Sequence, residues 1–393
     1  MSKRIGMEVA MAVAEAVALC RLDMAAVYPI TPNTHVAEHL SDIVAEGKID
    51  MEFLTVESEH SAMSAVMGAS ATGARTFTAT SSQGLRYMSE VLPIASAMRL
   101  PIVMSVANRA ISGPLSIWND HSDIMYERDA GWISIFGENG QEMIDMVIQA
   151  FKIAEHKDVM LPINVNMDGF QLTHMVEPFE IPEQAEVDKF LPSFVPYAAL
   201  HPDNPVTMGA LAVPEIFTEV MKAKDAALVN SKKVIIEVWK EWEKQFGRKY
   251  EPVSSFRAED AEVLFLTMGS MGETAEVAVD ELRKRGKAVG LLKLKLWRPF
   301  PFEELSKAAK GARVLAVLDR AVSFGGPGGP LGSEVRSAFY HKQQERPIIL
   351  DYLIGLGGRD MAVEDFIAIA EASLSTEKGK IKESYEFYGV RGK

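Results

Sequence analysis

The chain has 393 residues, of which 48% are hydrophobic and 24% charged, a balance typical of a globular protein and not of a disordered or coiled-coil one. Its formal net charge of -13 disfavours nucleic acid and anionic lipid as partners. The single cysteine, Cys20, excludes an internal disulfide, a zinc site built on cysteine pairs, and an iron–sulfur cluster held by this chain alone. The length predicts two or three domains.

Helical and strand patterns alternate along the first half of the chain. We expect helices at 6–21, 34–46, 58–72, 85–96 and 140–156, and strands at 24–28, 53–56, 76–80, 101–107 and 161–167. Such alternation predicts a parallel sheet covered by helices on both faces. Glu8 and Glu15 interrupt the apolar amino terminus, which favours an amphipathic helix over a signal peptide. Because no run of about 18 apolar residues is present, we expect a cytoplasmic protein without a membrane span.

The second half begins with a proline-rich segment, 171–214, which we interpret as an irregular wrapping segment or linker. A long amphipathic helix follows at 215–246, and Gly247 is a plausible stop. A second α/β unit shows strands and helices in alternation, with strands at 262–267, 288–293, 313–318 and 347–352 and helices at 274–284 and 363–370.

These patterns predict a first domain over 1–250, a second, smaller one over 251–374, and a charged tail at 375–393. The tail is either solvated or an extension that binds a partner. The second alternative rests on its aromatic residues, which are costly to expose. These are Tyr385, Phe387 and Tyr388.

The pentapeptide YPITP, residues 28–32, closes the first predicted strand. Ligands of open α/β sheets bind at the carboxyl ends of the strands, where this turn would lie. Its two prolines remove backbone donors and stiffen the turn. Thr31 would present its hydroxyl to that crevice, or it would only cap the following helix, and periodicity alone favours the cap.

A second polar segment, VESEHSA at 56–62, places Glu57, Glu59 and His60 at the start of a helix. Acidic groups are favoured there by the helix dipole, so capping is one interpretation. A carboxylate that points into a dry crevice would instead serve acid–base chemistry or activate a cofactor. The residues alone leave both interpretations open.

The segment 107–123 is a long loop after an apolar strand. Arg109 would lie at the carboxyl end of that strand, where a guanidinium can bind a carboxylate through two parallel hydrogen bonds. The alternative is an ion pair with Asp120 or Asp129. The polar residues of 119–123 resemble ligands of a hard metal, but adjacent residues rarely converge on one ion, and we expect no metal in this chain.

Two further turns carry weaker signals. In TSSQGL, residues 80–85, the side chains of Ser81, Ser82 and Gln83 would either orient a ligand or cap a helix. The glycine-rich stretch GGPGGPLGSE, residues 325–334, lacks the spacing of a dinucleotide-binding loop. The sequence contains no P-loop, GxSxG or HExxH motif.

Several strings taken together resemble the alpha subunit of 2-oxoacid:ferredoxin oxidoreductases, in particular the multi-subunit pyruvate:ferredoxin oxidoreductase type. In the first half they are YPITPNTHVAE, VESEHSAMSAVMGASATGARTFTATSSQGL, NRAISGPLSIWNDHSD, RDAGWI and LPINVNMDGF; in the second half they are MGSMGETAEVAVDEL, LKLWRPFPFEEL and GLGGRD. The resemblance covers nearly the whole chain. The order of YPITP, the SEH helix and the IWNDHSD loop is its most specific part.

The resemblance implies a transketolase-like α/β fold, with a pyrimidine-binding domain for thiamine diphosphate and a smaller transketolase C-terminal-like domain. It also implies oxidative decarboxylation of a small 2-oxoacid, with coenzyme A taking the acyl group and ferredoxin taking the electrons. Glu59 would hydrogen-bond the pyrimidine ring nitrogen of the cofactor and activate it. Thr31 and Arg109 would meet the substrate, and Pro29 and Thr31 would contact the cofactor.

The resemblance also makes two absences informative. Thiamine enzymes hold the diphosphate and Mg²⁺ with a GDG…N segment, and the sequence contains no GDG. Cluster binding needs several cysteines, and the chain has one. We therefore expect Mg²⁺ and the iron–sulfur clusters in partner chains, and a hetero-oligomer with beta, gamma and delta subunits or fusions of these.

Three rival interpretations stay open. The same chemistry would serve another 2-oxoacid, namely a branched-chain acid, 2-oxoglutarate, oxalate or an aryl glyoxylate. The small Gly113 and Pro114 near Arg109 favour pyruvate. A non-catalytic assembly subunit would use Glu59 only as a cap. A metal-dependent hydrolase would use the polar loop 119–123.

Overall fold

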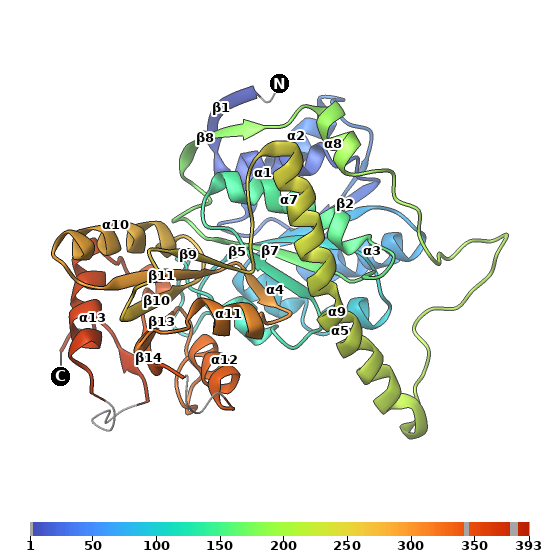
Figure 1. Ribbon diagram of the computed structural model, residues 1–393. Coiled ribbons are helices and arrows are strands. Elements are labelled where there is room, and N and C mark those ends of the chain that lie inside the picture. The colour runs from blue at the N-terminus through green and yellow to red at the C-terminus, as the bar shows by residue number, and fades with distance from the viewer. Residues whose placement is uncertain (1–2, 342–345, 378–383, 393) are drawn as a thin grey trace.

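The computed structural model describes residues 3–341, 346–377 and 384–392, and it shows two larger sheets and a two-stranded ribbon (Figure 1). The first sheet has the strand order β12-β6-β7-β5-β4-β2-β3. Its strands are β2 (Met24–Val27), β3 (Glu52–Thr55), β4 (Thr76–Thr80), β5 (Val103–Asn108), β6 (Ile133–Phe136), β7 (Ile163–Asp168) and β12 (Leu296–Arg298). All neighbours are parallel except β12 and β6.

Helices cover both faces of the first sheet, as the alternating pattern predicts. One hydrophobic core joins the sheet to α1 (Val9–Ala18), α2 (Thr34–Ala45) and α7 (Gly140–Ala154). The other core contains α3 (Glu59–Ala71), α4 (Ser82–Tyr87) and α5 (Leu92–Ala97). Consecutive residues of β2 enter opposite cores, Ala25 and Val27 the first and Ala26 the second, because side chains alternate along a strand.

The second sheet has the order β15-β14-β13-β10-β11-β9, and only β9 runs antiparallel to its neighbour. Its strands are β9 (Val253–Phe256), β10 (Val263–Thr267), β11 (Val289–Leu294), β13 (Val314–Asp319), β14 (Ile348–Leu353) and β15 (Glu386–Phe387). The accompanying helices are α6 (Ser122–Tyr126) near the first sheet and α10 (Met271–Lys284), α11 (Phe302–Ala308), α12 (Pro330–Phe339) and α13 (Val363–Ser375) near the second, with a 3-10 turn at Leu356–Gly358.

The expected helix at 6–21 is wrong at its start. Residues Lys3–Glu8 form strand β1, which pairs antiparallel with β8 (Val176–Ile181), and the helix begins at Val9. The segment 171–214 is accordingly less irregular than predicted, since it also contains α8 (Gln184–Phe190). A partner about 170 positions away satisfies the backbone groups of β1, and no local pattern reveals such pairing.

Other boundaries also differ from the predictions. The single helix expected at 85–96 is two short helices, because Pro93 lies in the first turn of α5 and cannot continue a helix from before it. The short strands β6, β9, β12 and β15 were not predicted. Strand β12 comes from the second half of the chain but pairs with β6 and so covers the edge of the first sheet.

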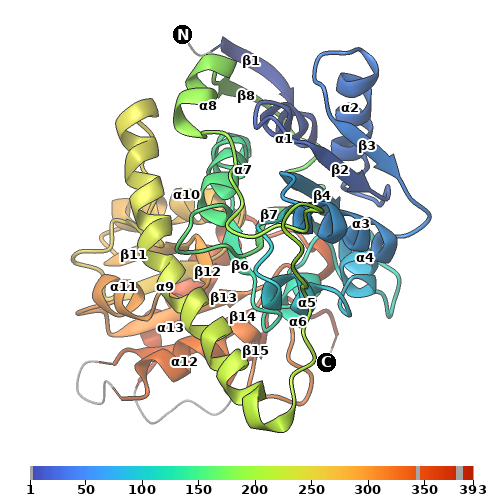
Figure 2. The same ribbon diagram turned by 90° about the vertical axis from the view of Figure 1, so that its right-hand side faces the viewer.

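The long helix is confirmed as α9 (Pro214–Phe246), and Gly247 ends it with a φ of 75°, in the left-handed region that glycine tolerates. Its second half buries Val234, Trp239 and Trp242 against the first core, whereas its first half is largely exposed. Figures 1 and 2 show α9 running along the outside of the molecule past both sheets. An ion pair of 3.1 Å between Lys232 and Glu304 of α11 ties it to the second unit.

The described part of the tail packs back onto the second sheet. Strand β15 pairs parallel with β14, and the Tyr388 hydroxyl donates to Asp365 at 3.1 Å. Phe387 stays 42% exposed. Residues 378–383 and 393 of the expected tail lie outside the described residues.

Candidate functional site

Three loops that follow strands of the first sheet meet at its carboxyl edge. The YPITP turn follows β2, the Thr80–Ser82 turn follows β4, and the Arg109 loop follows β5. The Asn33 amide donates to the Thr80 carbonyl at 3.2 Å, and the Arg109 guanidinium donates to the Thr31 carbonyl at 2.9 Å. Segments that are far apart in the sequence therefore form one edge, where parallel α/β sheets bind ligands.

Glu59 is the first residue of α3, and its side chain is buried, with 7% of its surface exposed. Ser58, not Glu59, caps the helix by accepting from the Ser61 amide at 3.2 Å. Within the described residues, no hydrogen bond to the Glu59 carboxylate is found. Capping therefore does not explain this carboxylate, which leaves the second interpretation of the segment.

The surroundings of Glu59 are tight on one side. A Cβ added at Gly84 would lie 2.6 Å from the Glu59 Oε1 and 2.5 Å from the Thr80 hydroxyl, so only glycine fits against the carboxylate. The Thr80 and Ser81 hydroxyl oxygens are buried and lack a hydrogen-bond partner in the described part of the chain. Polar atoms without partners beside an unpaired carboxylate indicate a site for a polar group from outside the chain.

The two polar neighbours of Glu59 differ from it. Glu57 is exposed and accepts a hydrogen bond from the Ser61 hydroxyl, which lowers the pKa of that carboxyl from its ordinary value. His60 lies 3.5 Å from the exposed Glu90 and near the ring of Tyr87. Of the three candidates in this segment, only Glu59 points into the protein.

Arg109 lies at the end of β5, with 8% of its surface exposed. Its Nε donates to the Ser116 carbonyl at 3.0 Å and its Nη1 to the Thr31 carbonyl at 2.9 Å. Within the described residues Arg109 forms no ion pair with Asp120 or Asp129, so that alternative is not supported. Burial lowers the pKa of Arg109, and the nearby Asp123 opposes that shift. The Nη2 atom has no partner within the described residues, so one edge of the guanidinium is available to an anion.

Thr31 and Pro29 are exposed to solvent at this edge. Thr31 is joined to Arg109 through its carbonyl, and its side chain makes no hydrogen bond to any described residue. Large apolar side chains rim the same region with substantial exposure; they are Tyr28, Tyr87, Leu115, Ile117 and Trp118. An apolar rim around a polar site is typical of a surface that a partner covers.

The polar residues of 119–123 do not converge on one point, so the metal-cluster interpretation of this loop is not supported. Asp120 accepts from the Ser122 amide at 2.9 Å, and its other oxygen accepts from the Gly357 amide at 3.1 Å. His121 points instead toward Asp168, 2.8 Å away. Asp120 therefore binds backbone amides and His121 binds another side chain. The hydrolase alternative loses its basis, because it needs these residues to bind a metal together.

Asp123 organises the site from within, a role that sequence reasoning missed. It accepts from the amides of Ser82 and Arg109 at 3.0 Å each, and from Asn108 at 3.0 Å. Burial raises the pKa of Asp123 to about 7, against these donors, which favour the carboxylate. The charged residues that follow the buried strand β5 are the sequence signal that could have indicated this role of Asp123.

A buried cluster behind the site joins the two sheets and was also missed. Asp168, at the end of β7, contacts His121, the Arg320 guanidinium at 2.5 Å and the Ser270 amide at 2.8 Å. Burial opposes ionisation of Asp168, but the charge of Arg320 and the hydrogen bonds from His121 and Ser270 outweigh it and hold the pKa of this carboxyl below its usual range. Burial lowers the pKa of His121, so we assign it as a neutral donor to Asp168.

The remaining turns have structural explanations. The Ser82 hydroxyl bonds to the Ala110 carbonyl at 2.8 Å and to Gln83 at 2.7 Å. In the glycine-rich segment, the amides of Gly329 and Gly332 donate to Asp351 and Asp319 at 3.0 Å each. Carboxylates therefore occupy the position that a phosphate would need.

The fold and this edge define an α/β protein of the transketolase-like thiamine diphosphate class. Two solved structures share the arrangement. A 2-oxoglutarate:ferredoxin oxidoreductase from Magnetococcus marinus, with 2-oxoglutarate, coenzyme A and succinyl-CoA bound, aligns with a TM-score of 0.69 and 21% identity over 95% of this chain and 66% of that chain. A split-gene transketolase aligns with a TM-score of 0.56 and 13% identity over 94% and 99% of the two chains.

Sequence comparison identifies the family more closely. The family described as pyruvate flavodoxin/ferredoxin oxidoreductase, thiamine diphosphate-binding, matches residues 15–240, and core domain II of pyruvate:ferredoxin oxidoreductase matches 261–366. The chain belongs to the pyruvate:ferredoxin oxidoreductase family. The resemblance stated from the sequence motifs is thereby confirmed.

Full-length relatives agree with this assignment. Pyruvate synthase subunit PorA of Pyrococcus abyssi is 46% identical over 97% of this chain and 96% of its own length. PorA of Thermotoga maritima is 48% identical over 92% of each chain. Ketoisovalerate oxidoreductase subunit VorA of Pyrococcus abyssi is 44% identical over 97% and 96%.

Among the described residues, no helix combines the length and the apolar character that a membrane crossing needs.

Proposed function

We propose that this chain is the alpha subunit of a pyruvate:ferredoxin oxidoreductase, which oxidatively decarboxylates pyruvate with coenzyme A to acetyl-CoA and CO2 and passes electrons to ferredoxin. The observation that carries the proposal is the buried Glu59 carboxylate, unpaired within the described residues, at the carboxyl edge of the first sheet. Membership of the family and the full-length PorA relatives support the assignment of the reaction.

The residues around Glu59 fit the aminopyrimidine of thiamine diphosphate. The carboxylate lacks a partner within the described residues, Gly84 admits close approach, and the Thr80 and Ser81 hydroxyls have unused hydrogen-bonding capacity. Bound there, the cofactor would supply the carbon nucleophile for decarboxylation. Glu59 would accept a hydrogen bond from its ring nitrogen and orient it, while Pro29 would contact the ring.

Arg109 and Thr31 would bind the substrate. The free edge of the Arg109 guanidinium suits the substrate carboxylate, and the Thr31 hydroxyl suits its carbonyl oxygen. The Ser116 and Thr31 carbonyls fix the guanidinium, so that it is positioned before substrate arrives. The site thus provides charge and orientation for a small 2-oxoacid.

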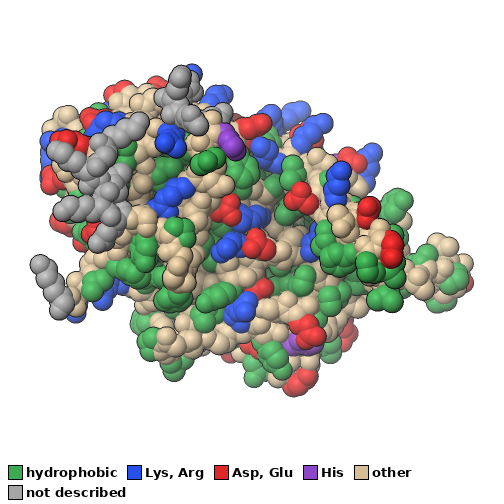
Figure 3. Space-filling model, turned by 90° about the horizontal axis from the view of Figure 1, so that it is seen from below, with side chains coloured by type: hydrophobic (Ala, Val, Ile, Leu, Met, Phe, Trp, Pro, Cys, Tyr) green, Lys and Arg blue, Asp and Glu red, His purple; other side chains and the backbone are tan. Residues whose placement is uncertain are grey.

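The rest of the active site would come from other chains. The sequence has no GDG segment and one cysteine, so we assign Mg²⁺, the diphosphate contacts and the iron–sulfur clusters to beta, gamma and delta partners or fusions of these. The apolar rim of the site supports such a partner. So do the hydrophobic side chains on the protruding end of the molecule, over the loop before α9 and the start of that helix (Figure 3), among them Tyr197, Leu211 and Phe217.

The same assignment carries a domain division. We propose that residues 1–250, with their wrapping segment 171–214 and long helix 215–246, form the pyrimidine-binding domain, that 251–374 form the transketolase C-terminal-like domain, and that 375–393 form a tail. The family matches at 15–240 and 261–366 support this boundary. Strand β12 departs from it, because it belongs to the first sheet.

A branched-chain 2-oxoacid is the second candidate substrate, since VorA covers almost the whole chain at 44% identity. Steady-state kinetics of the native complex with a panel of 2-oxoacids, coenzyme A and a low-potential dye decides between them. We expect kcat/KM for pyruvate to exceed that for 2-oxoisovalerate and 2-oxoglutarate. A preference for 2-oxoisovalerate would favour the second candidate substrate. The absence of coenzyme A-dependent activity with every acid of the panel would overturn the proposal.

Replacing Arg109 with lysine in the complex should raise the KM for pyruvate by about 10- to 100-fold. Lysine keeps the positive charge but lacks the planar guanidinium that bonds to two carbonyls and the substrate at once. A hydrogen bond to a charged group contributes about 1.5–3 kcal/mol, which corresponds to the expected change in KM. Initial-rate kinetics measures KM. The control is Arg128→Lys, the same change at a partly exposed arginine whose guanidinium bonds to the Met125 carbonyl, and it should keep the original KM. An unchanged KM in Arg109→Lys would remove this residue from the substrate site.

A further inference from the structure

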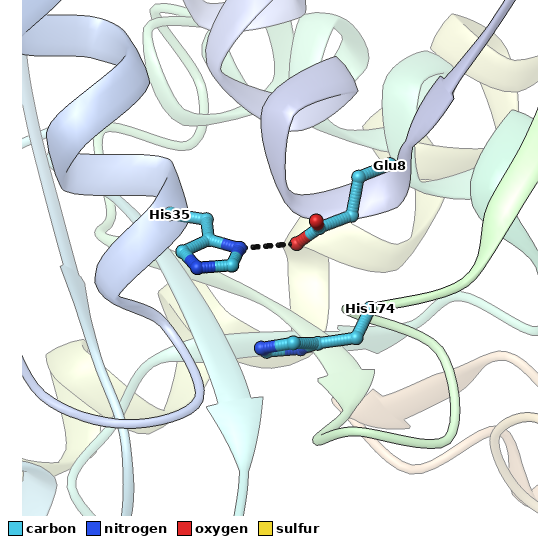
Figure 4. A group of neighbouring side chains, drawn as sticks. All are labelled: Glu8, His35 and His174. Carbon is cyan, nitrogen blue, oxygen red and sulfur yellow. Dashed lines mark hydrogen bonds and ion pairs between the residues drawn. The ribbon is translucent and has the colours of Figure 1, made fainter.

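Three potential metal ligands from distant segments meet beside the amino-terminal ribbon. They are Glu8 at the end of β1, His35 in the first turn of α2, and His174 between β7 and β8. One ligand atom from each lies within 4.8 Å of the others (Figure 4). In the part of the chain that the structure describes, this is the one group of three or more such residues.

The backbone around this group is held firmly. Glu8 pairs with Val176 in the β1–β8 ribbon, and the Ala10 amide donates to the Thr173 carbonyl at 3.0 Å, which places Glu8 beside His174. Packing between α1 and α2 brings His35 to the same point. The convergence thus rests on ordered elements and not on loose surface side chains.

The ring nitrogens are suitably arranged for a cation. His35 Nδ1 lies 2.5 Å from the Glu8 Oε1. His174 Nδ1 lies 2.7 Å from the Thr173 hydroxyl oxygen, which can accept its proton and leave Nε2 as a free lone pair. Histidines that bind metals usually donate their other ring N–H to such an acceptor. The Thr173 hydroxyl is therefore already in place to hold the His174 ring with its Nε2 free for an ion.

One carboxyl group and two imidazole rings face one another at this point. The rings of His35 and His174 have centroids 4.8 Å apart, and the Phe170 ring lies 4.6 Å from that of His174. Two protonated imidazoles at this separation would repel each other, whereas one divalent ion between them and Glu8 attracts all three.

We propose that Glu8, His35 and His174 bind one zinc ion, with water in a fourth position. Two imidazoles and one carboxylate are a ligand set that zinc accepts, at bond lengths of about 2.0–2.2 Å. Ligand atoms of a tetrahedral site lie about 3.3–3.6 Å apart, so the Glu8–His35 pair, now at 2.5 Å, would open to admit the ion while the His174 ring turns toward it. The ion would join the ribbon to α2, whose first turn begins three residues after Thr31. This site is separate from the function proposed above, and its ligands are too far apart in the sequence to form a motif.

The test uses the full chain, stripped of metal with a chelator and titrated with Zn²⁺. We expect one equivalent to bind and the thermal unfolding midpoint to rise with free Zn²⁺. His174→Gln should weaken binding at least about tenfold. The matched control is His39→Gln, because His39, one turn further along α2, forms a similar 2.8 Å pair with Glu15 of α1 but has no third ligand among the described residues. The control should bind zinc like the unaltered chain.

A second measurement needs no variant. Co²⁺ added to the metal-free chain should give the intense visible bands of a four-coordinate site, and Zn²⁺ should displace them. Weak six-coordinate bands would overturn the proposal, as would the absence of stoichiometric binding. Equal loss of zinc in His39→Gln and His174→Gln, or equal retention in both, would overturn it too.

Discussion

Replacing Glu59 with glutamine should lower kcat of the reconstituted complex with pyruvate by about 10²- to 10⁴-fold, the range that a positioned acid or base contributes. Glutamine preserves the shape beside Gly84 but removes the negative charge and half of the accepting capacity. The carboxylate has no partner among the described residues, so its loss breaks no internal bond. Steady-state kinetics gives kcat, and the thermal midpoint of the variant should stay close to that of the unaltered chain.

The matched control is Glu57→Gln. It is the same change two residues earlier, on an exposed side chain whose only described contact is with Ser61. We expect this control to keep near-normal turnover. If Glu59→Gln turned over pyruvate as fast as the control, the chain would be an assembly subunit, and the catalytic role proposed for Glu59 would be lost.

Replacing Asp168 with asparagine should lower the free energy of unfolding by about 3–5 kcal/mol, because it leaves the buried Arg320 charge without a counterion. His121 and Ser270 lose their charged acceptor in the same step. Since these residues come from both sheets, we expect the contact between the two units to loosen first. Urea unfolding of the full chain, followed by tryptophan fluorescence, measures the loss.

Asp188→Asn provides the comparison for this prediction. Asp188 also pairs with an arginine, Arg21, at 2.6 Å, but both side chains are substantially exposed to solvent. Exposed ion pairs often contribute little that is measurable, so the urea midpoint of this variant should not move. Equal midpoints for the Asp168 and Asp188 variants would contradict the role assigned to the buried cluster.

The sequence predicted the regular elements best where local patterns are strong. Strand β4 and helix α9 fall where alternation and amphipathic period place them, and Gly247 ends α9 as predicted. It missed β1 and began the helix at residue 6 instead of Val9, because the pairing of β1 with the distant β8 leaves no local pattern. Short edge strands such as β12 carry too few residues for a period to be recognised.

For the site, the sequence by itself determined that Thr31, Glu59 and Arg109 each follow a predicted strand of a parallel sheet, where ligands bind. Only the tertiary structure decided what each side chain does there. It turned Glu59 inward while Glu57 faces solvent, gave Arg109 two carbonyls in place of an acid, and brought Glu8 to two distant histidines. The physical reason is that periodicity fixes the face of an element on which a residue lies. Burial and partners depend on segments that fold against it from far along the chain.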